Sequence, residues 1–409
     1  MKQDIRILPR EKYQDMLRRS EGAPVIKIIT GMRRCGKSAL LMLFRDELIS
    51  NGKGEHVYYR KFDDELESDV PDHRDLIEDV KTKVDVGPGD YIILDEIQDV
   101  EGWERAVMSF FENGADVYIT GSNAHMLSSE LSTKLSGRFI EIEVLPLSFR
   151  EFISFRREAG DESDTAGLFE RFYRNGSLPA VALLDKTQEN LVDTMIVGIF
   201  NTVYVKDVLE RNSIRNVALM DNLNRFLMKD IGNRVSVKNA SGFLTSMGMK
   251  RQTTPQTIDN YISMLERALL FHRSKRMDAE TRTFLVTTEK FYCNDLGIRN
   301  SIVGLRVEDL DGILENLVFL ELKYRFGSVF TLGVGRHEVD FIVKGDKGPE
   351  YYQVCYDLNN EDTFKREVTP LRSMDDNYPK TIVVWNDYPL KDIDGIRVVR
   401  IMDWLTGSD

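Results

Sequence analysis

The chain has 409 residues, too many for one ordinary hydrophobic core, so we expect two to four domains. Its net charge of −12, with 42% hydrophobic and 30% charged residues, is typical of a soluble globular protein and argues against a surface that is basic throughout. No apolar run approaches the roughly 18 residues of a membrane-spanning helix. The three cysteines have neither metal-ligand nor disulfide-framework spacing, and charges occupy the place of a secretory signal's apolar core, so a cytoplasmic location without membrane attachment is expected.

The first third of the chain alternates segments of strand and helix character, which predicts a parallel α/β sheet. Helices are expected at 38–48 and 103–113, because apolar residues recur there at helical spacing. The expected strands are short β-rich runs at 24–30, 56–63, 91–96, 116–122 and 138–144.

After residue 150 the strand signal fades, and helical spacing of apolar residues predicts a helical region over 151–235. Residues 236–300 are expected to form two helices and a two-stranded hairpin, the order of a winged helix. Such a unit can place its second helix in a DNA groove. A helical scaffold that contacts only protein is an equally open interpretation.

The last hundred residues change character again. A helix at 315–326 precedes three strands, a helix near 361–376 and two further strands, which is the order α-β-β-β-α-β with one strand added. We therefore expect four regions: 1–150, 151–235, 236–300 and 301–409.

The strongest motif lies between the first expected strand and the first expected helix. It satisfies G-x-x-x-x-G-K-[ST], and the candidate binding residues are Gly31, Met32, Arg33, Arg34, Cys35, Gly36, Lys37, Ser38 and Ala39. The two glycines let the backbone curl around phosphates with its N–H groups inward, and the helix that follows adds the positive end of its dipole. Lys37 should reach the β- and γ-phosphates, and the Ser38 hydroxyl should ligate magnesium. For Arg33 and Arg34 a phosphate contact and a solvated position are both open, and Cys35 is interpreted as a spacer.

A second motif ends the strand 91–96, where an apolar run finishes in Asp95 and Glu96. Asp95 can hold magnesium through its water shell, and Glu96 can polarise the attacking water as a general base. Two consecutive acids favour hydrolysis of the nucleotide over simple storage.

Two further candidates are less specific. The strand 116–122 leads into Ser122 and Asn123, either of which can orient the lytic water. Arg138 precedes the next strand and can neutralise charge in the transition state, often from a neighbouring subunit. A surface arginine in a turn is the alternative.

Taken together, GMRRCGKSALL, YIILDEIQDV and TGSNAHMLSSELSTKLSGRFIEIEVLPLSFREF resemble AAA-type ATPases of bacteria and archaea that carry a C-terminal region of uncharacterised function. The resemblance implies ATP as the nucleotide and a P-loop sheet with an additional strand between the strands of the two motifs. By this likeness Lys37, Ser38, Asp95 and Glu96 take their usual roles, Asn123 is the sensor and Arg138 an arginine finger. Many AAA-type relatives form rings, so a homo-oligomer is among the expectations.

The strand and helix order of residues 301–409 resembles restriction-endonuclease-like domains, whose sites need an acid on one strand and E-x-K on the next. Asp340 stands in the place of the first acid, but Gln353 and Cys355 replace the glutamate and the lysine. A neutral amide is a weaker ligand for a hard cation, so we expect a nuclease-like fold without cleavage. Glu315 or Glu321 could supply a helix carboxylate, and Lys365 or Arg366 could lend charge from the next helix.

The leading hypothesis is an AAA-type ATPase that acts as a motor or switch on a partner, with DNA as one candidate. The alternatives are an ATP-gated, magnesium-dependent nuclease and a nucleotide-dependent protein-interaction module.

Overall fold

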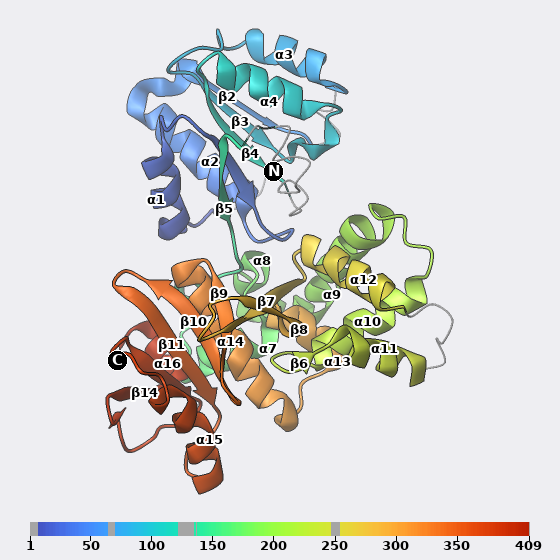
Figure 1. Ribbon diagram of the computed structural model, residues 1–409. Helices are drawn as coiled ribbons and strands as arrows, with labels where there is room; N and C mark the ends of the chain where they lie inside the picture. The colour runs from blue at the N-terminus through green and yellow to red at the C-terminus, as the bar shows by residue number, and fades with distance from the viewer. Residues whose placement is uncertain (1–6, 64–69, 122–134, 136, 247–253, 409) are drawn as a thin grey trace. The chain divides into compact units, whose positions relative to one another are not determined.

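The computed structural model describes residues 7–63, 70–121, 135, 137–246 and 254–408 (Figure 1). The chain divides into two compact units, residues 1–146 with 267–269 and residues 147–266 with 270–409. Across these described residues, no helix has both the length and the apolar character needed to cross a membrane.

The first unit is built on a five-stranded sheet in the order β2-β3-β4-β1-β5, and every neighbouring pair of strands is parallel. The strands confirm the predicted ones: β1 (Ile26–Thr30), β2 (Val57–Lys61), β3 (Tyr91–Asp95), β4 (Asp116–Thr120) and β5 (Phe139–Glu143). β4 lies between β1 and β3, so the additional strand between the two motif strands is confirmed.

Helices cover both faces of this sheet, as the burial of every residue in β1 and β3 requires. α3 and α4 pack on one face through a core that includes Ile28, Ile92 and Phe110. On the other face, the ring of Phe44 in α2 packs 4.9 Å from that of Tyr118 in β4. The helices are α1 (Glu11–Ser20), α2 (Lys37–Leu48), α3 (His73–Lys81) and α4 (Trp103–Glu112), with short helical turns at Ile49–Lys53, Gly54–His56 and Ile97–Asp99.

The second unit begins with helices, as the apolar spacing predicts. α6 starts at a capping box, in which the Glu151 backbone N–H donates to the Ser148 hydroxyl and the Glu151 carboxylate accepts from the Ser148 N–H. The helices are α6 (Phe149–Glu158), α7 (Thr165–Asn175), α8 (Pro179–Ala182), α9 (Val192–Thr202) and α10 (Val217–Lys229), with a turn at Lys186–Leu191 and a π-helical continuation of α9 at Val203–Glu210.

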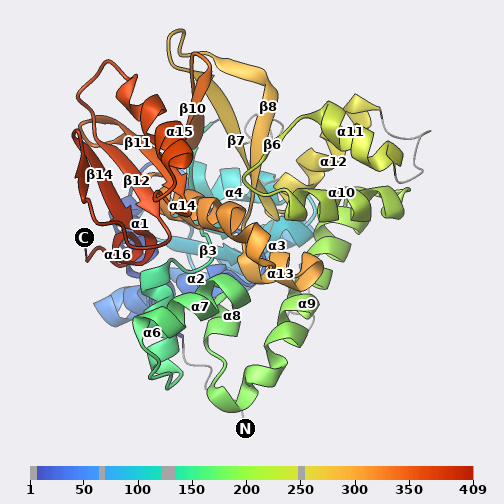
Figure 2. The same cartoon turned by 90° about the horizontal axis from the view of Figure 1, so that it is seen from below.

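The next elements follow the order expected over 236–300. After α10 come β6 (Arg234–Val235), α11 (Val237–Ser246), α12 (Pro255–Arg267) and the hairpin β7 (Phe271–Asp278) and β8 (Phe284–Cys293). β8 pairs antiparallel with both β6 and β7. Figure 2 shows α10, α11 and α12 gathered beside this hairpin.

The hairpin continues into the C-terminal sheet, because β7 pairs in parallel with β9. The nine strands run in the order β13-β14-β12-β11-β10-β9-β7-β8-β6, so residues on either side of 300 share one sheet. The predicted order is present as α14 (Leu310–Phe326), β9 (Val329–Val334), β10 (His337–Gly345), β11 (Gly348–Cys355), α15 (Glu361–Arg372), β12 (Lys380–Val384) and β14 (Ile396–Arg400). The structure adds elements that were not predicted: α13 (Leu296–Val303), a turn at Val307–Asp309, the two-residue strand β13 (Asp392–Ile393) and α16 (Ile401–Thr406).

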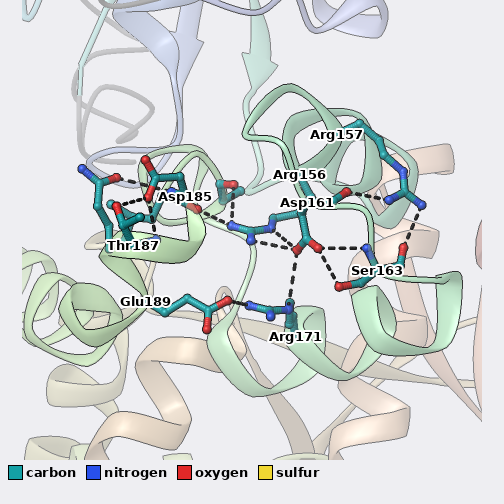
Figure 3. A network of polar contacts seen from close by, with 11 residues as sticks. Arg156, Arg157, Asp161, Ser163, Arg171, Asp185, Thr187 and Glu189 are labelled. Atoms are coloured by element: carbon teal, nitrogen blue, oxygen red, sulfur yellow. Dashed lines mark hydrogen bonds and ion pairs between the residues drawn. The ribbon is translucent and has the colours of Figure 1, made fainter.

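A buried ion pair joins the first helices of the second unit (Figure 3). Arg156 in α6 donates from Nε and Nη2 to Asp161 Oδ2 at 2.9 and 2.8 Å, and from Nη1 to the carbonyls of Ala182 and Leu184. Burial alone would raise the pKa of Asp161, but hydrogen bonds from Ser163 and Arg156 hold it well below its ordinary value. The ionised pair therefore fastens α6 to the segments that follow it.

Asp161→Asn removes one partner of this pair and should lower the stability of the second unit by about 3–5 kcal/mol, because the Arg156 charge stays buried without its counter-ion. Urea unfolding followed by tryptophan fluorescence measures the change. Two of the three tryptophans, Trp385 and Trp404, lie in the second unit, and Trp385 packs against Phe169 of α7. Glu170→Gln, which breaks an exposed pair with Arg174, is the matched control and should cost less than about 0.5 kcal/mol. Equal losses in the two variants would contradict a central role for Asp161.

Candidate nucleotide-binding site

The P-loop follows the carboxyl end of β1 and leads into α2. Gly31 has φ 150°, and a Cβ there would lie 2.4 Å from the Val144 carbonyl oxygen, so only glycine fits. Gly36 (φ 102°) and Arg34 (φ 68°) also have positive φ, and they turn the loop back toward the helix. The backbone therefore has the tight curvature that a phosphate cradle needs.

Lys37 is the first residue of α2, and its side chain is buried within the loop. Its Nζ donates to the carbonyls of Gly31 and Met32 at 2.9 and 3.3 Å and lies 3.6 Å from Glu96 Oε1. The ammonium group therefore lies between the P-loop and Glu96, the acid that ends the second motif.

The second motif meets the P-loop at the carboxyl edge of the sheet. Asp95 is fully buried at the end of β3, and the Ser38 hydroxyl hydrogen-bonds to its carboxylate. Burial raises the pKa of Asp95, and the bonds from Thr120 and Ser38 oppose that shift. Hydroxyl and carboxylate thus stand side by side, which is the ligand pair expected for magnesium.

Thr120 is a site residue that the sequence analysis missed. Its Oγ1 donates to Asp95 Oδ1 at 2.5 Å and accepts from the backbone N–H of Glu96 at 2.8 Å. This contact supports Glu96 in a left-handed conformation (φ 57°), with its carboxylate held by Gln98. Its position as the last residue of β4, the strand beside β3, could have revealed it.

The remaining P-loop candidates lie where the sequence places them but differ in exposure. Met32 and Cys35 are fully buried, Arg33 and Ala39 are half-buried, and Arg34 is exposed. Burial raises the pKa of the Cys35 thiol, so this cysteine is an uncharged packing group, which fits its interpretation as a spacer.

Of the remaining candidates, Arg138 is not brought to the P-loop of its own chain. Ser122 and Asn123 lie outside the described residues. Arg138 precedes β5, and its carbonyl accepts from the N–H of Ile26, the first residue of β1, whereas the P-loop follows the other end of β1. A five-residue strand is about 16 Å long, so Arg138 lies far from the P-loop of its own chain. Its side chain is half exposed, 3.8 Å from Glu112.

The residues present fit a magnesium-bound nucleoside triphosphate. The loop provides N–H donors at the start of a helix, Lys37 provides a positive charge, and Ser38 and Asp95 provide oxygen ligands. The lysine would have to give up two backbone carbonyls, for which phosphate oxygens are stronger acceptors.

Comparisons with known proteins agree with this geometry. Residues 24–153 match a family described as AAA domain, and residues 166–309 match a domain of unknown function (DUF8612). Over 402 residues the chain is 33% identical to an uncharacterised protein of Haemophilus influenzae, and the match covers 98% of each chain. It is also 29% identical over 379 residues to the uncharacterised protein MJ1544 of Methanocaldococcus jannaschii, covering 88% of this chain and 82% of that protein.

Among solved structures, the chain is similar to a Walker-type ATPase of Pyrococcus abyssi. The TM-score is 0.51 at 15% identity, and the match covers 73% of this chain and 99% of that one. At this identity the likeness concerns the fold.

Thr120→Val keeps the shape of the side chain but leaves the buried Glu96 N–H and the Asp95 carboxylate without the hydroxyl. We expect the first unit to lose about 2–3 kcal/mol of stability, measured by urea unfolding. Thr120→Ser keeps the hydroxyl and should lose less than about 1.5 kcal/mol. If the valine variant were as stable as the serine variant, the hydroxyl would not be what supports the two acids.

Proposed function

Because this chain belongs to the same family as the Haemophilus influenzae protein and carries an AAA-type P-loop ATPase domain, we propose that it binds ATP with Mg²⁺ and hydrolyses it. The observation that carries the proposal is the convergence of Lys37, Ser38, Asp95 and Glu96 at one edge of the parallel sheet. Turnover would change the posture of the second unit on a partner, so the protein would act as a motor or switch.

The four side chains divide the work. Lys37 would exchange the carbonyls of the loop for β- and γ-phosphate oxygens and neutralise charge that develops there. Ser38 and Asp95 would hold Mg²⁺, which supplies further neutralisation of the phosphates. Glu96, fixed through its backbone by Thr120, would orient water and accept its proton.

Asn123 and Arg138 keep their proposed roles as sensor and arginine finger. Since Arg138 lies at the amino end of β5, it could serve only the site of a neighbouring subunit. Its exposed guanidinium suits that role, which makes a homo-oligomer part of the proposal.

Phosphate release by the purified protein tests the proposal. Lys37→Ala should abolish both turnover and tight ATP binding, whereas Glu96→Gln should lower turnover at least about 100-fold and still bind ATP, because it loses only the base. Arg19→Gln, which breaks an exposed ion pair with Asp15 in the same unit, is the matched control. ATP binding without turnover in the wild type would favour the alternative of a nucleotide-dependent interaction module, and full turnover in Glu96→Gln would exclude Glu96 as the base.

The second unit bears on the nuclease alternative. Here the Lys290 ammonium lies 2.8 Å from Glu315 Oε1, 2.9 Å from Asp340 Oδ1 and 3.4 Å from Glu338 Oε1. Burial alone would lower the pKa of Lys290, but the three carboxylates raise it, so the ammonium stays charged. This buried cation stands among the acids that a nuclease would offer to a metal. Among the described residues, no three His, Cys, Asp or Glu side chains are arranged to hold a metal ion.

Of the two residues that depart from the nuclease pattern, Gln353 and Cys355, the glutamine belongs to a chain of hydrogen bonds. Gln353 accepts from the backbone N–H of Asp340 and donates to Glu367 at 2.6 Å, and the other Asp340 oxygen accepts from the Val354 N–H. Cys355 is buried, and burial raises the pKa of its thiol to about 12. We therefore propose that this part of the chain serves binding or assembly.

The other candidates divide in the same region. Glu315 and Arg366 line a cavity of about 600 Å³ in the second unit, together with Glu367, which was not among the candidates. Glu321 pairs instead with Arg325, and Lys365 pairs with Glu361 at the surface.

DNA remains a candidate partner, supported by the order of α11, α12 and the hairpin. The acids of α12, Asp259 and Glu266, are paired with Arg273, which lies 3.4 and 2.7 Å away. On the exposed side of α12, Gln256 and Asn260 are hydrogen-bonded to each other. Side-chain amides of this kind can form hydrogen bonds to adenine. A scaffold that contacts only protein is the alternative.

Labelled duplex DNA tests both whether the protein binds DNA and whether it cleaves DNA. We expect binding that weakens steeply with salt and at least about tenfold on Gln256→Ala/Asn260→Ala, measured by fluorescence anisotropy. Lys391→Gln, which removes an exposed charge elsewhere in the unit, should change affinity little. No cleavage is expected with Mg²⁺ or Mn²⁺. Cleavage that Asp340→Ala abolishes would establish the nuclease, and absence of binding at low salt would remove DNA as the partner.

A further inference from the structure

Arg10, the residue before α1, sends a buried guanidinium to two distant parts of the first unit. Its Nη1 donates to the Cys35 carbonyl of the P-loop at 3.0 Å and to the Leu145 carbonyl at 2.7 Å, and its Nη2 donates to the Pro146 carbonyl at 3.2 Å. The residue is only 4% exposed, and its guanidinium lies over the ring of Tyr13, 4.6 Å from the centroid. One cation thus serves three backbone carbonyls, a geometry that suits the planar fork of arginine.

The segment at Val144–Pro146 is itself in contact with the P-loop. The Val144 carbonyl occupies the space that a side chain at Gly31 would need, and the Val144 N–H donates to Thr30, the residue before the loop. Pro146 is the last residue of the N-terminal segment of the first unit. The chain therefore leaves the ATPase domain directly from the wall of its phosphate loop.

Helix α1 gives Arg10 a firm base. The Tyr13 hydroxyl accepts from the Leu145 N–H at 3.1 Å, and Gln14 donates to the Leu40 carbonyl of α2 at 3.3 Å. Tyr13, Gln14 and Leu17 are buried along this helix. Because Arg10 is held in this way, a shift of the P-loop should also move Val144–Pro146, the segment through which the chain leaves the first unit. Closely packed groups do not move independently of one another.

We propose that Arg10 is a positioning residue for the nucleotide site and links the state of the P-loop to the segment that enters the second unit. In a trans peptide the C=O and N–H groups point in opposite directions, so holding the Cys35 carbonyl aims the Gly36 N–H away from Arg10 as a phosphate donor. When that N–H bonds phosphate, the same peptide pulls on the guanidinium and hence on Leu145 and Pro146. The inference rests on the proposed binding of ATP.

The next residues carry the signal onward within the second unit. The Leu147 N–H donates to the Ser177 carbonyl at 2.9 Å, and Ser148 caps α6. The Ser177 N–H in turn donates to the buried carboxylate of Asp295 at 2.7 Å. A shift of Val144–Pro146 would therefore be passed to the hydrogen-bonded residues Leu147, Ser177 and Asp295 of the second unit.

The experiment compares Arg10→Met, Arg10→Lys and Tyr13→Phe with the wild-type full chain. Steady-state ATPase kinetics and hydrogen exchange of residues 142–148, with and without ATP and Mg²⁺, are the readouts. Arg10→Met should raise KM for ATP about tenfold, equal to one charge-assisted hydrogen bond, and should lose the ATP-induced change in exchange. Arg10→Lys should recover part of both, because an ammonium group can serve fewer carbonyls in fixed directions.

Tyr13→Phe is the matched control, since it removes a contact to Leu145 but none to the P-loop. It should raise exchange at residue 145 in both states and leave KM within about twofold of wild type. The proposal would be overturned if Arg10→Met melted at a lower temperature but kept the wild-type KM and the ATP-induced change in exchange. If the methionine variant does not fold, a wild-type KM and a wild-type change in exchange in Arg10→Lys would overturn it. Failure of the wild type to bind ATP would instead refute the proposed function.

Discussion

The parallel register of β1, β4 and β3 is the constraint on which the candidate site depends. Each strand ends at the same edge of the sheet, so the P-loop, Thr120 and the Asp95–Glu96 pair meet although they are far apart in the chain. Because β4 lies between the other two strands, its last residue, Thr120, stands beside β3, and the Thr120 hydroxyl donates to Asp95. The chemistry of the site therefore follows from strand order as much as from the motifs.

The two units use buried carboxylates in contrasting ways. In the first, Asp95 is supported by neutral hydroxyls, which leaves its charge to be balanced by a cation. In the second, Lys290 already balances Glu315 and Asp340 within the protein. Burial raises the pKa of Glu315, and the neighbouring ammonium of Lys290 opposes that shift. This difference is consistent with catalysis in the ATPase unit and with a binding or assembly role elsewhere.

The first sheet and the P-loop could be predicted from the sequence because the signals that reveal them are local. Short β-rich runs located all five strands of the first sheet, and the P-loop has its required strand and helix on either side. What escaped prediction depends on long-range pairing. Thr120, Arg10 and Lys290 carry no motif, and each acquires its role only when strands or helices distant in sequence come together. The parallel pairing of β7 with β9, which joins the hairpin to the C-terminal sheet, is of the same kind.

The proposed function requires that the P-loop and the second motif together hold a metal-bound triphosphate. Calorimetric titration with a non-hydrolysable ATP analogue, with and without Mg²⁺, measures this directly. The wild type should bind one analogue per chain with an affinity that Mg²⁺ strengthens, and Asp95→Ala should lose that strengthening while it retains weak binding through the loop. Absence of binding by the wild type with Mg²⁺ present would contradict the account, as would an unchanged effect of Mg²⁺ in the Asp95 variant.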